Sequence, residues 1–249
     1  MKNSPCNSRL SVFFFLMTFA LALFSWVANI YGWGDIQSLL SAEGIRWFLG
    51  HVVENYVSCP ALGIVLILLM GLGVVLHSGL YGILKRLCQK EKLLSHKERW
   101  ALTLTMVVGG IYVMIVVASL LLPWNFMWGI TGTWLHSPFS KGLVYVLSIG
   151  IGLSGVVYGY ASGNFRRLSD VMTGMSCLIA RESSYFVTLF FITQFFSLLV
   201  YMRLPAWVHL SDDVVNMLYL LCSYLPLNGI LRRLQSCGLR FWGATCNFR

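Results

Sequence analysis

Three polar side chains inside the long apolar stretches of this sequence are candidates for chemistry, because imidazole and amide groups are rare there. His77 stands within one apolar run, Gln194 is near the middle of another, and Asn29 belongs to the first. Polar groups at membrane depth often line ion or substrate pathways, so these residues are candidates for a substrate pathway. The alternatives are a hydrogen-bonded histidine near the membrane surface, and helix-to-helix hydrogen bonds made by Gln194 and Asn29.

No grouping of residues indicates catalysis or metal binding. The nine acidic residues are dispersed, and the sequence has no HExxH motif, no Ser/His/Asp set and no phosphate-binding loop. The seven cysteines include no CxxC pair. Gly150–Gly155 matches the GxGxxG string, but it lies inside an uncharged apolar span and not at a strand-to-helix turn facing water. We therefore expect no enzyme activity, no cofactor and no metal ligands.

The elements that must position the polar residues are long apolar helices. Five stretches of at least 20 residues contain no charged side chain, and a helix needs about 20 residues to cross ~30 Å of hydrocarbon. The expected fold class is all-α, a polytopic integral membrane helix bundle in which residues 1–249 form a single transmembrane domain. Transmembrane helices are expected at about 10–31, 61–84, 101–123, 142–163 and 183–202, with a marginal sixth at 214–231.

Composition and charge agree with a membrane protein. The chain is 57% hydrophobic and only 11% charged, whereas about a quarter of the residues in soluble domains are charged. Fifteen of the 18 Lys and Arg residues fall on one side of the membrane if the amino terminus is cytoplasmic, as the positive-inside rule requires. The net charge of +9 is therefore an orientation signal, and we expect no nucleic-acid partner.

Residues 38–56 differ from the spans because charged side chains lie opposite an apolar face. This pattern predicts an amphipathic helix on the outer interface, with Ser41 as its N-cap. Such a helix would either cover the bundle or form a gate at the mouth of a substrate pathway.

Small residues mark one face of the fourth predicted span. Gly155, Gly159 and Gly163 recur at every fourth position, a spacing that lets two transmembrane backbones approach closely. We expect this face to pack against another helix and not against lipid. Glycines of this kind also occur in transporter helices that slide or break.

Two blocks of the sequence are similar to a known family. The first, from Ser38 to Leu80, contains SAEGIRWFL, PALG, GLGV and SGL. The second contains SPFSKG, GVVYGYASG and SYFV and continues to Phe195, and Glu98–Trp100 reads ERW before the third span. Together the blocks cover roughly residues 10–203 in family order, and they resemble the aminobenzoyl-glutamate transporter family, AbgT.

The resemblance implies a multi-pass secondary transporter of the bacterial inner (cytoplasmic) membrane, usually a homodimer. It would move folate breakdown products such as aminobenzoyl-glutamate, or export antimetabolites. The implied partners are the lipid bilayer, a small anionic substrate and a coupling ion, H+ or Na+. Full members are longer, and the two re-entrant hairpin regions with the family's substrate and ion ligands have no counterpart here. The alternatives are a non-transporting structural or regulatory membrane subunit and a degenerate gene product.

Overall fold

The computed structural model describes residues 5–33, 36–88, 95–121 and 138–227. All regular elements within these ranges are helices, which confirms the expected all-α class.

The chain forms two compact units that alternate along the sequence. The first comprises Met1–Gly63 and Glu182–Ser236, and the second comprises Ile64–Arg181 and Cys237–Arg249. The single transmembrane domain expected over residues 1–249 stays a prediction.

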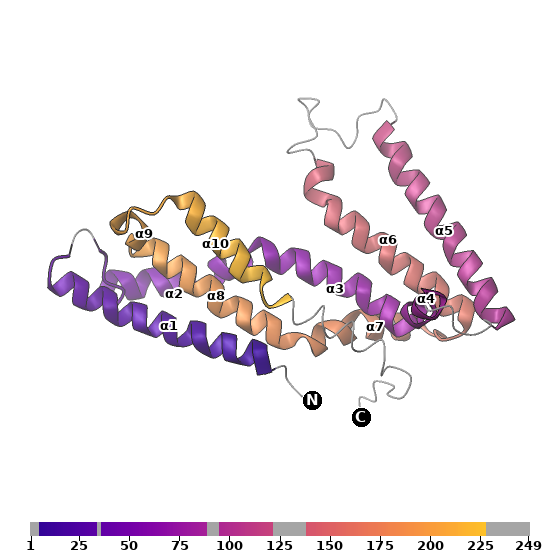
Figure 1. The fold of residues 1–249 in the computed structure, drawn as a ribbon, viewed down its shortest axis with the longest axis horizontal. Coiled ribbons are helices and arrows are strands. Elements are labelled where there is room, and N and C mark those ends of the chain that lie inside the picture. The colour runs from indigo at the N-terminus through magenta and orange to yellow at the C-terminus, as the bar shows by residue number, and fades with distance from the viewer. Residues whose placement is uncertain (1–4, 34–35, 89–94, 122–137, 228–249) are drawn as a thin grey trace. The chain divides into compact units, whose positions relative to one another are not determined.

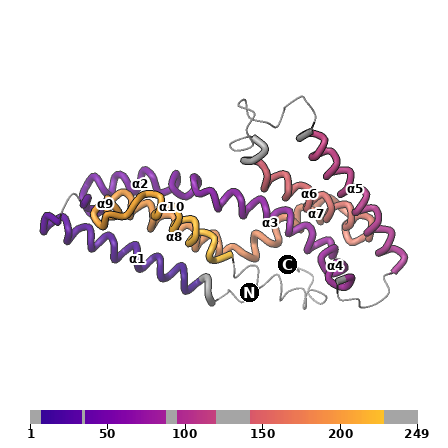
Figure 2. The backbone as a smooth tube through the Cα atoms, turned by 45° about the horizontal axis from the view of Figure 1, so that its top comes forward, coloured from indigo at the N-terminus to yellow at the C-terminus, as the bar shows by residue number. Residues whose placement is uncertain are grey.

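Helix α8 forms the centre of the first unit. The helices of this unit are α1 (Pro5–Ile30), α2 (Ala42–Val57), α8 (Ser183–Tyr201), the short α9 (Leu204–Trp207) and α10 (Asp212–Tyr224). Helices α1, α2 and α10 all pack on α8 (Figures 1 and 2). Phe14, Ile192, Phe196 and Val215 form a buried cluster that joins α1, α8 and α10. A helix that is apolar on all sides, as α8 is, can be surrounded in this way.

Helix α2 runs antiparallel along α8. At one end, the rings of Trp47 and Tyr201 stack with their centroids 4.2 Å apart. At the other end, the Tyr56 hydroxyl donates a hydrogen bond of 3.1 Å to the Phe186 carbonyl. Helix α2 therefore lies alongside α8, which is a candidate membrane span, and α2 itself belongs to the candidate span Ala42–Ser78.

The outer interfacial position expected for residues 38–56 stays a prediction. The helix itself is present, and Ser41 caps it by accepting a hydrogen bond from the Gly44 backbone N–H. The side that meets α8 carries Trp47 and Tyr56, whereas the apolar row Ile45, Leu49, Val53 and Val57 is 48–69% exposed. An amphipathic pattern shows that the two faces of a helix have different surroundings, but it does not show which face lipid or another helix covers.

The second unit is built on an antiparallel pair, α5 and α6. Its helices are most of α3 (Pro60–Ser78), α4 (Leu80–Cys88), α5 (His96–Leu121), α6 (Pro138–Ser162) and α7 (Leu168–Arg181). Ala101 near the start of α5 packs in a cluster with Tyr158 near the end of α6. Further along, the Tyr112 hydroxyl donates to the Val146 carbonyl over 2.7 Å. The start of α5 and the end of α6 therefore lie at the same end of the pair (Figure 1).

Five helical segments of the described chain are long and apolar enough to cross a membrane. They correspond to the five expected spans, with α2 added to the second, and they run over Ser8–Ile30, Ala42–Ser78, His96–Ser119, Gly142–Ser162 and Ser183–Tyr201. The marginal sixth helix, expected at 214–231, is represented by α10, which has 13 residues. At 1.5 Å per residue this helix is about 20 Å long, shorter than the hydrocarbon layer. Residues 228–231 lie outside the described chain.

Large apolar side chains point outward on the spanning helices. On α5, Met106, Met114 and Ile115 are all at least 61% exposed. In water such a surface would be unfavourable, whereas in lipid apolar side chains belong on the outside. The exposed faces therefore identify the surface that the bilayer covers.

Candidate functional site

Gln194 lies in the middle of α8 and bonds to the backbone of α2. Its side-chain amide donates to the Val52 carbonyl over 2.8 Å, and the residue is 3% exposed. The Gln194 Oε1 atom is buried and has no hydrogen-bond partner in the described structure, and the same is true of Asn55 Nδ2 on α2. An unsatisfied acceptor and an unsatisfied donor thus lie on neighbouring helices of the first unit. Buried polar atoms of this kind call for a water, a ligand or a rearranged partner.

Asn29 has a different environment from Gln194, although both belong to the first unit. It lies in the last turn of α1, is exposed, and donates to the Ile36 carbonyl over 3.3 Å. This contact ties the end of α1 to the segment that leads into α2. The structure therefore does not bring Asn29 and Gln194 into one polar pathway.

His77 belongs to the second unit and lies in the last turn of α3. Its ring stacks on Phe165, with the centroids 5.8 Å apart. A cavity of about 10 Å³, large enough for one water molecule, is lined by Gly73, Leu76, His77, Cys177, Leu178 and Arg181. The imidazole therefore lies between α3 and α7, at the end of a membrane-spanning helix.

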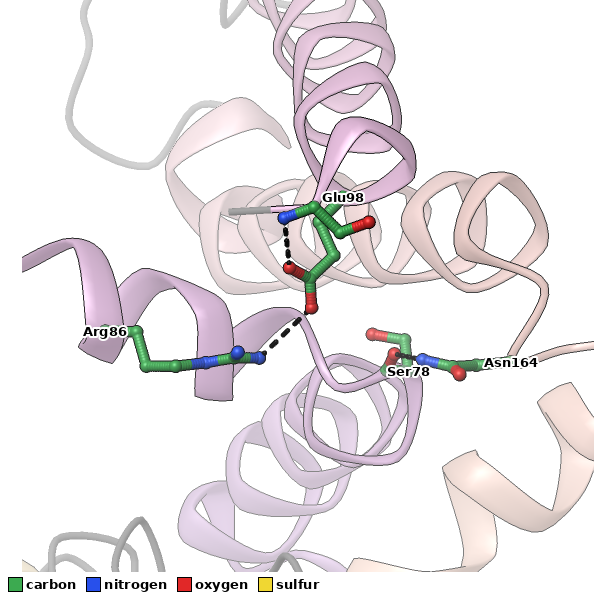
Figure 3. Close-up of polar contacts among 5 residues, drawn as sticks. Ser78, Arg86, Glu98 and Asn164 are labelled. Atoms are coloured by element: carbon green, nitrogen blue, oxygen red, sulfur yellow. Dashed lines mark hydrogen bonds and ion pairs between the residues drawn. The ribbon is translucent and has the colours of Figure 1, made fainter. Parts of the chain in front are cut away.

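The second span is interrupted directly after His77. The helix expected over 61–84 is divided at Gly79, whose φ of +84° is costly for residues with a Cβ, and α4 then begins at Leu80. The Ser78 carbonyl at the break accepts a hydrogen bond of 2.7 Å from the Asn164 side-chain amide (Figure 3). Asn164 comes from the link between α6 and α7, 86 residues away.

This contact solves a specific problem of membrane helices. The candidate span ends at Ser78, so the break lies at a span end. The last carbonyls of a helix have no partner within that helix, and the apolar part of a bilayer offers no replacement donors. Asn164 supplies one donor, and Ser78 supplies local bonds: its hydroxyl donates to the Val75 carbonyl and accepts from the Leu80 N–H. The break is therefore stabilised from outside its own helix and can exist as a defined structural feature.

A charged contact holds α4 against the start of α5. The Arg86 guanidinium lies 3.4 Å from a Glu98 carboxylate oxygen (Figure 3). The other Glu98 oxygen accepts from the Ser95 backbone N–H over 3.0 Å, as a capping box requires. Glu98 thus caps α5 and binds α4 at the same time.

A second carboxylate organises the link between α6 and α7. Asp170 Oδ2 accepts from the Arg166 and Arg167 backbone N–H groups, at 2.9 and 3.0 Å. These two hydrogen bonds favour the ionised form and lower the pKa of Asp170 below its ordinary value. The chain that carries Asn164 and Phe165 is therefore held in a fixed turn.

The three glycines of α6 have different surroundings. A Cβ on Gly155 would lie 3.0 Å from the Val75 backbone nitrogen of α3, and one on Gly159 would collide with the Phe165 ring. Gly163 has open space around it and a φ of +81°, and it follows directly after the end of α6. Gly155 therefore contacts another helix and Gly159 makes room for a ring. Gly163 departs from the expectation of helix packing, because its role is to end the helix.

The described residues contain no group of three or more His, Cys, Asp or Glu side chains that could hold a metal ion. The candidate site described above is built from hydrogen bonds, the Arg86–Glu98 ion pair and close helix packing.

Sequence reasoning did not identify Ser78 and Asn164 as site residues. The available signals were a Ser-Gly pair inside an apolar run and an Asn after the terminal glycine of a span.

The fold is that of a multi-pass membrane protein, with five candidate spans in the described chain. The crystal structure of the YdaH transporter of Alcanivorax borkumensis, described as having an unusual topology, is similar to this chain with a TM-score of 0.70. The match covers 79% of this chain and 71% of that chain at 19% sequence identity, so it shows a shared fold. No curated relative matches the chain.

The model of the AbgT transporter family matches residues 10–111 and 85–218. These two matches cover most of the chain, and the protein belongs to the AbgT family.

Proposed function

We propose that this AbgT-family protein moves small anionic solutes of the aminobenzoyl-glutamate or antimetabolite type across the bacterial inner membrane, coupled to H+ or Na+. In this proposal the chain works as a homo-oligomer with a cytoplasmic amino terminus. The family match supports transport in general, and the substrate class comes from the resemblance of the sequence motifs.

The observation that carries the proposal is the interrupted second span. Secondary transporters commonly bind substrates and ions near discontinuous helices, because the exposed ends of the half-helices present partial charges and free backbone groups. Here the Asn164 side-chain amide donates a hydrogen bond to the Ser78 carbonyl at the break, and Gly79 follows His77 by two residues. A break maintained by a distant side chain indicates a built feature, since an uncompensated break would be unstable in lipid.

The buried polar atoms of Gln194 and Asn55 provide a second, independent point of support. Both residues lie between α2 and α8 inside the first unit, and each retains hydrogen-bonding capacity. A polar solute or water could use that capacity during transport, which an apolar packing contact could not offer.

Transport can be tested in cells that express the chain. Uptake and export of aminobenzoyl-glutamate and of a sulfonamide are compared with an empty vector, at equal membrane levels of protein. We expect transport by the parent and a reduced rate for Asn164→Ala. The matched control is Asn216→Ala, since Asn216 is an exposed residue of α10 in the first unit. Parent rates equal to those of the empty vector would refute transport of these solutes.

A second candidate function is a non-transporting structural or regulatory membrane subunit. The family model matches in two overlapping segments, 10–111 and 85–218, and not in one continuous run. Two segments are what a chain would give if it lacked internal parts of the family, such as the hairpin regions.

Purification in mild detergent distinguishes the two candidates. A different protein retained in constant stoichiometry would favour the subunit. A homo-oligomer whose melting temperature rises on addition of aminobenzoyl-glutamate would favour the transporter, because only a ligand that binds the folded state stabilises it.

A further inference from the structure

Basic side chains from three segments of the second unit gather at one end of the α5–α6 pair. They come from the last turn of α4, the first turn of α5 and the link between α6 and α7, and they are Lys85, Lys97, Arg99, Arg166 and Arg167. Three contacts bring these segments together. The Arg86–Glu98 ion pair joins α4 to α5, the Asn164–Ser78 hydrogen bond joins the link to the α3–α4 break, and a buried cluster around Tyr158 joins α4, α5 and α6.

Nearby carboxylates neutralise only part of the positive charge of this surface. Glu98 and Asp170 are the acidic residues within the described parts of these segments. Glu98 is bonded to Arg86 and to the Ser95 N–H, and Asp170 is bonded to two backbone N–H groups. None of the five basic side chains named above forms an ion pair within the described chain.

The segments that carry these charges also expose large apolar side chains. Trp100 is 60% exposed, Leu168 76% and Met172 66%. On α4, Leu84 and Leu87 are also exposed, next to Lys85 and Arg86. A surface that mixes cations with exposed aromatic and aliphatic groups suits the boundary between lipid headgroups and acyl chains.

The position of the surface relative to the spans determines what it meets. The candidate span of α5 begins at His96, and that of α6 ends at Ser162. Because the two helices are antiparallel, Lys97 and Arg99 lie at the same membrane surface as Arg166 and Arg167. Each of these residues is within five positions of a span end, so the side chains lie at the level of the headgroups.

We propose that this surface, formed by Lys85, Lys97, Arg99, Arg166 and Arg167 with their exposed apolar neighbours, binds anionic phospholipid. The phosphate of a headgroup without a compensating ammonium, such as phosphatidylglycerol, pairs with Arg166 and Arg167. Guanidinium groups suit this role because they offer several donors in a fixed planar arrangement. Asp170 contributes by holding the backbone of both arginines, so that the two side chains leave the turn at defined positions. The apolar side chains contact the upper part of the acyl chains.

The test measures lipid retained by the purified protein, using native mass spectrometry with phosphatidylglycerol and phosphatidylcholine as probes. The test variant is the double substitution Arg166→Gln/Arg167→Gln. The matched control, Arg46→Gln/Arg203→Gln, removes the same charge from the first unit. We expect the test variant to lose on the order of 10- to 30-fold in affinity for phosphatidylglycerol, from roughly fivefold for each charge near an anionic surface. The control should bind as the parent does, and the preference over phosphatidylcholine should weaken at high salt.

Two further measurements decide what the surface recognises. Arg166→Lys/Arg167→Lys keeps the charge but not the planar donors, so it should bind phosphatidylglycerol more tightly than the glutamine variant and less tightly than the parent. Glycerol phosphate and inorganic phosphate should fail to displace the lipid, since they lack acyl chains.

The proposal is overturned if the control variant loses as much lipid as the test variant. It is also overturned if phosphatidylcholine binds equally well, or if inorganic phosphate displaces the phospholipid at similar concentration.

Discussion

Replacement of selected glycines by alanine should destabilise the second unit in a graded order that the geometry of each site predicts. A Cβ on Gly73 of α3 would lie 2.5 Å from the Gly174 backbone oxygen of α7. A Cβ on Gly155 of α6 would lie 3.0 Å from the Val75 nitrogen of α3. Both obstacles are backbone atoms, which can move away only if two helices separate.

The expected size follows from two opposing terms. Overpacking of a close contact costs roughly 1–3 kcal/mol, whereas replacing glycine by alanine inside a helix gains about 0.5–1 kcal/mol. The net loss for Gly155→Ala is therefore about 0–2.5 kcal/mol, and Gly73→Ala should reach or exceed the upper end. At about 2–4 °C per kcal/mol for a chain of this size, a loss of about 2.5 kcal/mol corresponds to a decrease in melting temperature of roughly 5–10 °C.

Two other glycines provide matched controls. A Cβ on Gly110 of α5 would have no neighbour within 4 Å, and a Cβ on Gly152 of α6 would make only an ordinary contact of 3.6 Å with Gly71. Gly110→Ala should be neutral or slightly stabilising, and Gly152→Ala should be nearly neutral. Thermal unfolding in mild detergent, with size-exclusion chromatography to confirm a monodisperse sample, measures the order. If Gly73→Ala and Gly155→Ala melt at or above Gly110→Ala, the close-packing argument is wrong.

Three further predictions concern the helix break, the charged turn and the orientation. Asn164→Ala should cost about 0.5–1.5 kcal/mol of stability, because the Ser78 carbonyl loses its donor, and thermal unfolding against the parent measures this loss. Asp170→Asn should melt below the parent at neutral pH. The pKa of Asp170 is lowered in the folded chain, so the ionised carboxylate stabilises the fold at pH values above 3.8, the ordinary pKa of this group. The difference should disappear as the pH falls through the lower folded-state pKa, and a gap that persists there would contradict this account. A cysteine at position 37 should react with an impermeant reagent in intact cells, while one at position 97 should not; the reverse pattern would refute a cytoplasmic amino terminus.

The sequence by itself determined the helical class and the number of spanning segments. The reason is that crossing a bilayer is a local requirement: about 20 consecutive apolar residues suffice, whatever their neighbours are. The five expected spans agree with the five candidate spans to within a few residues at most ends, apart from the break after Ser78 and the addition of α2 to the second span. The family motifs were also readable, since short ordered blocks of sequence do not depend on knowing the packing.

The tertiary structure alone decided which neighbour each residue meets. Asn164 and Ser78 are 86 positions apart, and no periodicity links a carbonyl to a donor over that distance. Residues 38–56 have the amphipathic pattern of a surface helix, yet Trp47 and Tyr56 of this segment pack against α8. Gly155 and Gly163 have the same spacing in the sequence, but one lies against the α3 backbone and the other has a positive φ at the helix end. Contacts between distant segments depend on the whole packing arrangement, and the local pattern that predicts a helix carries no information about its partner.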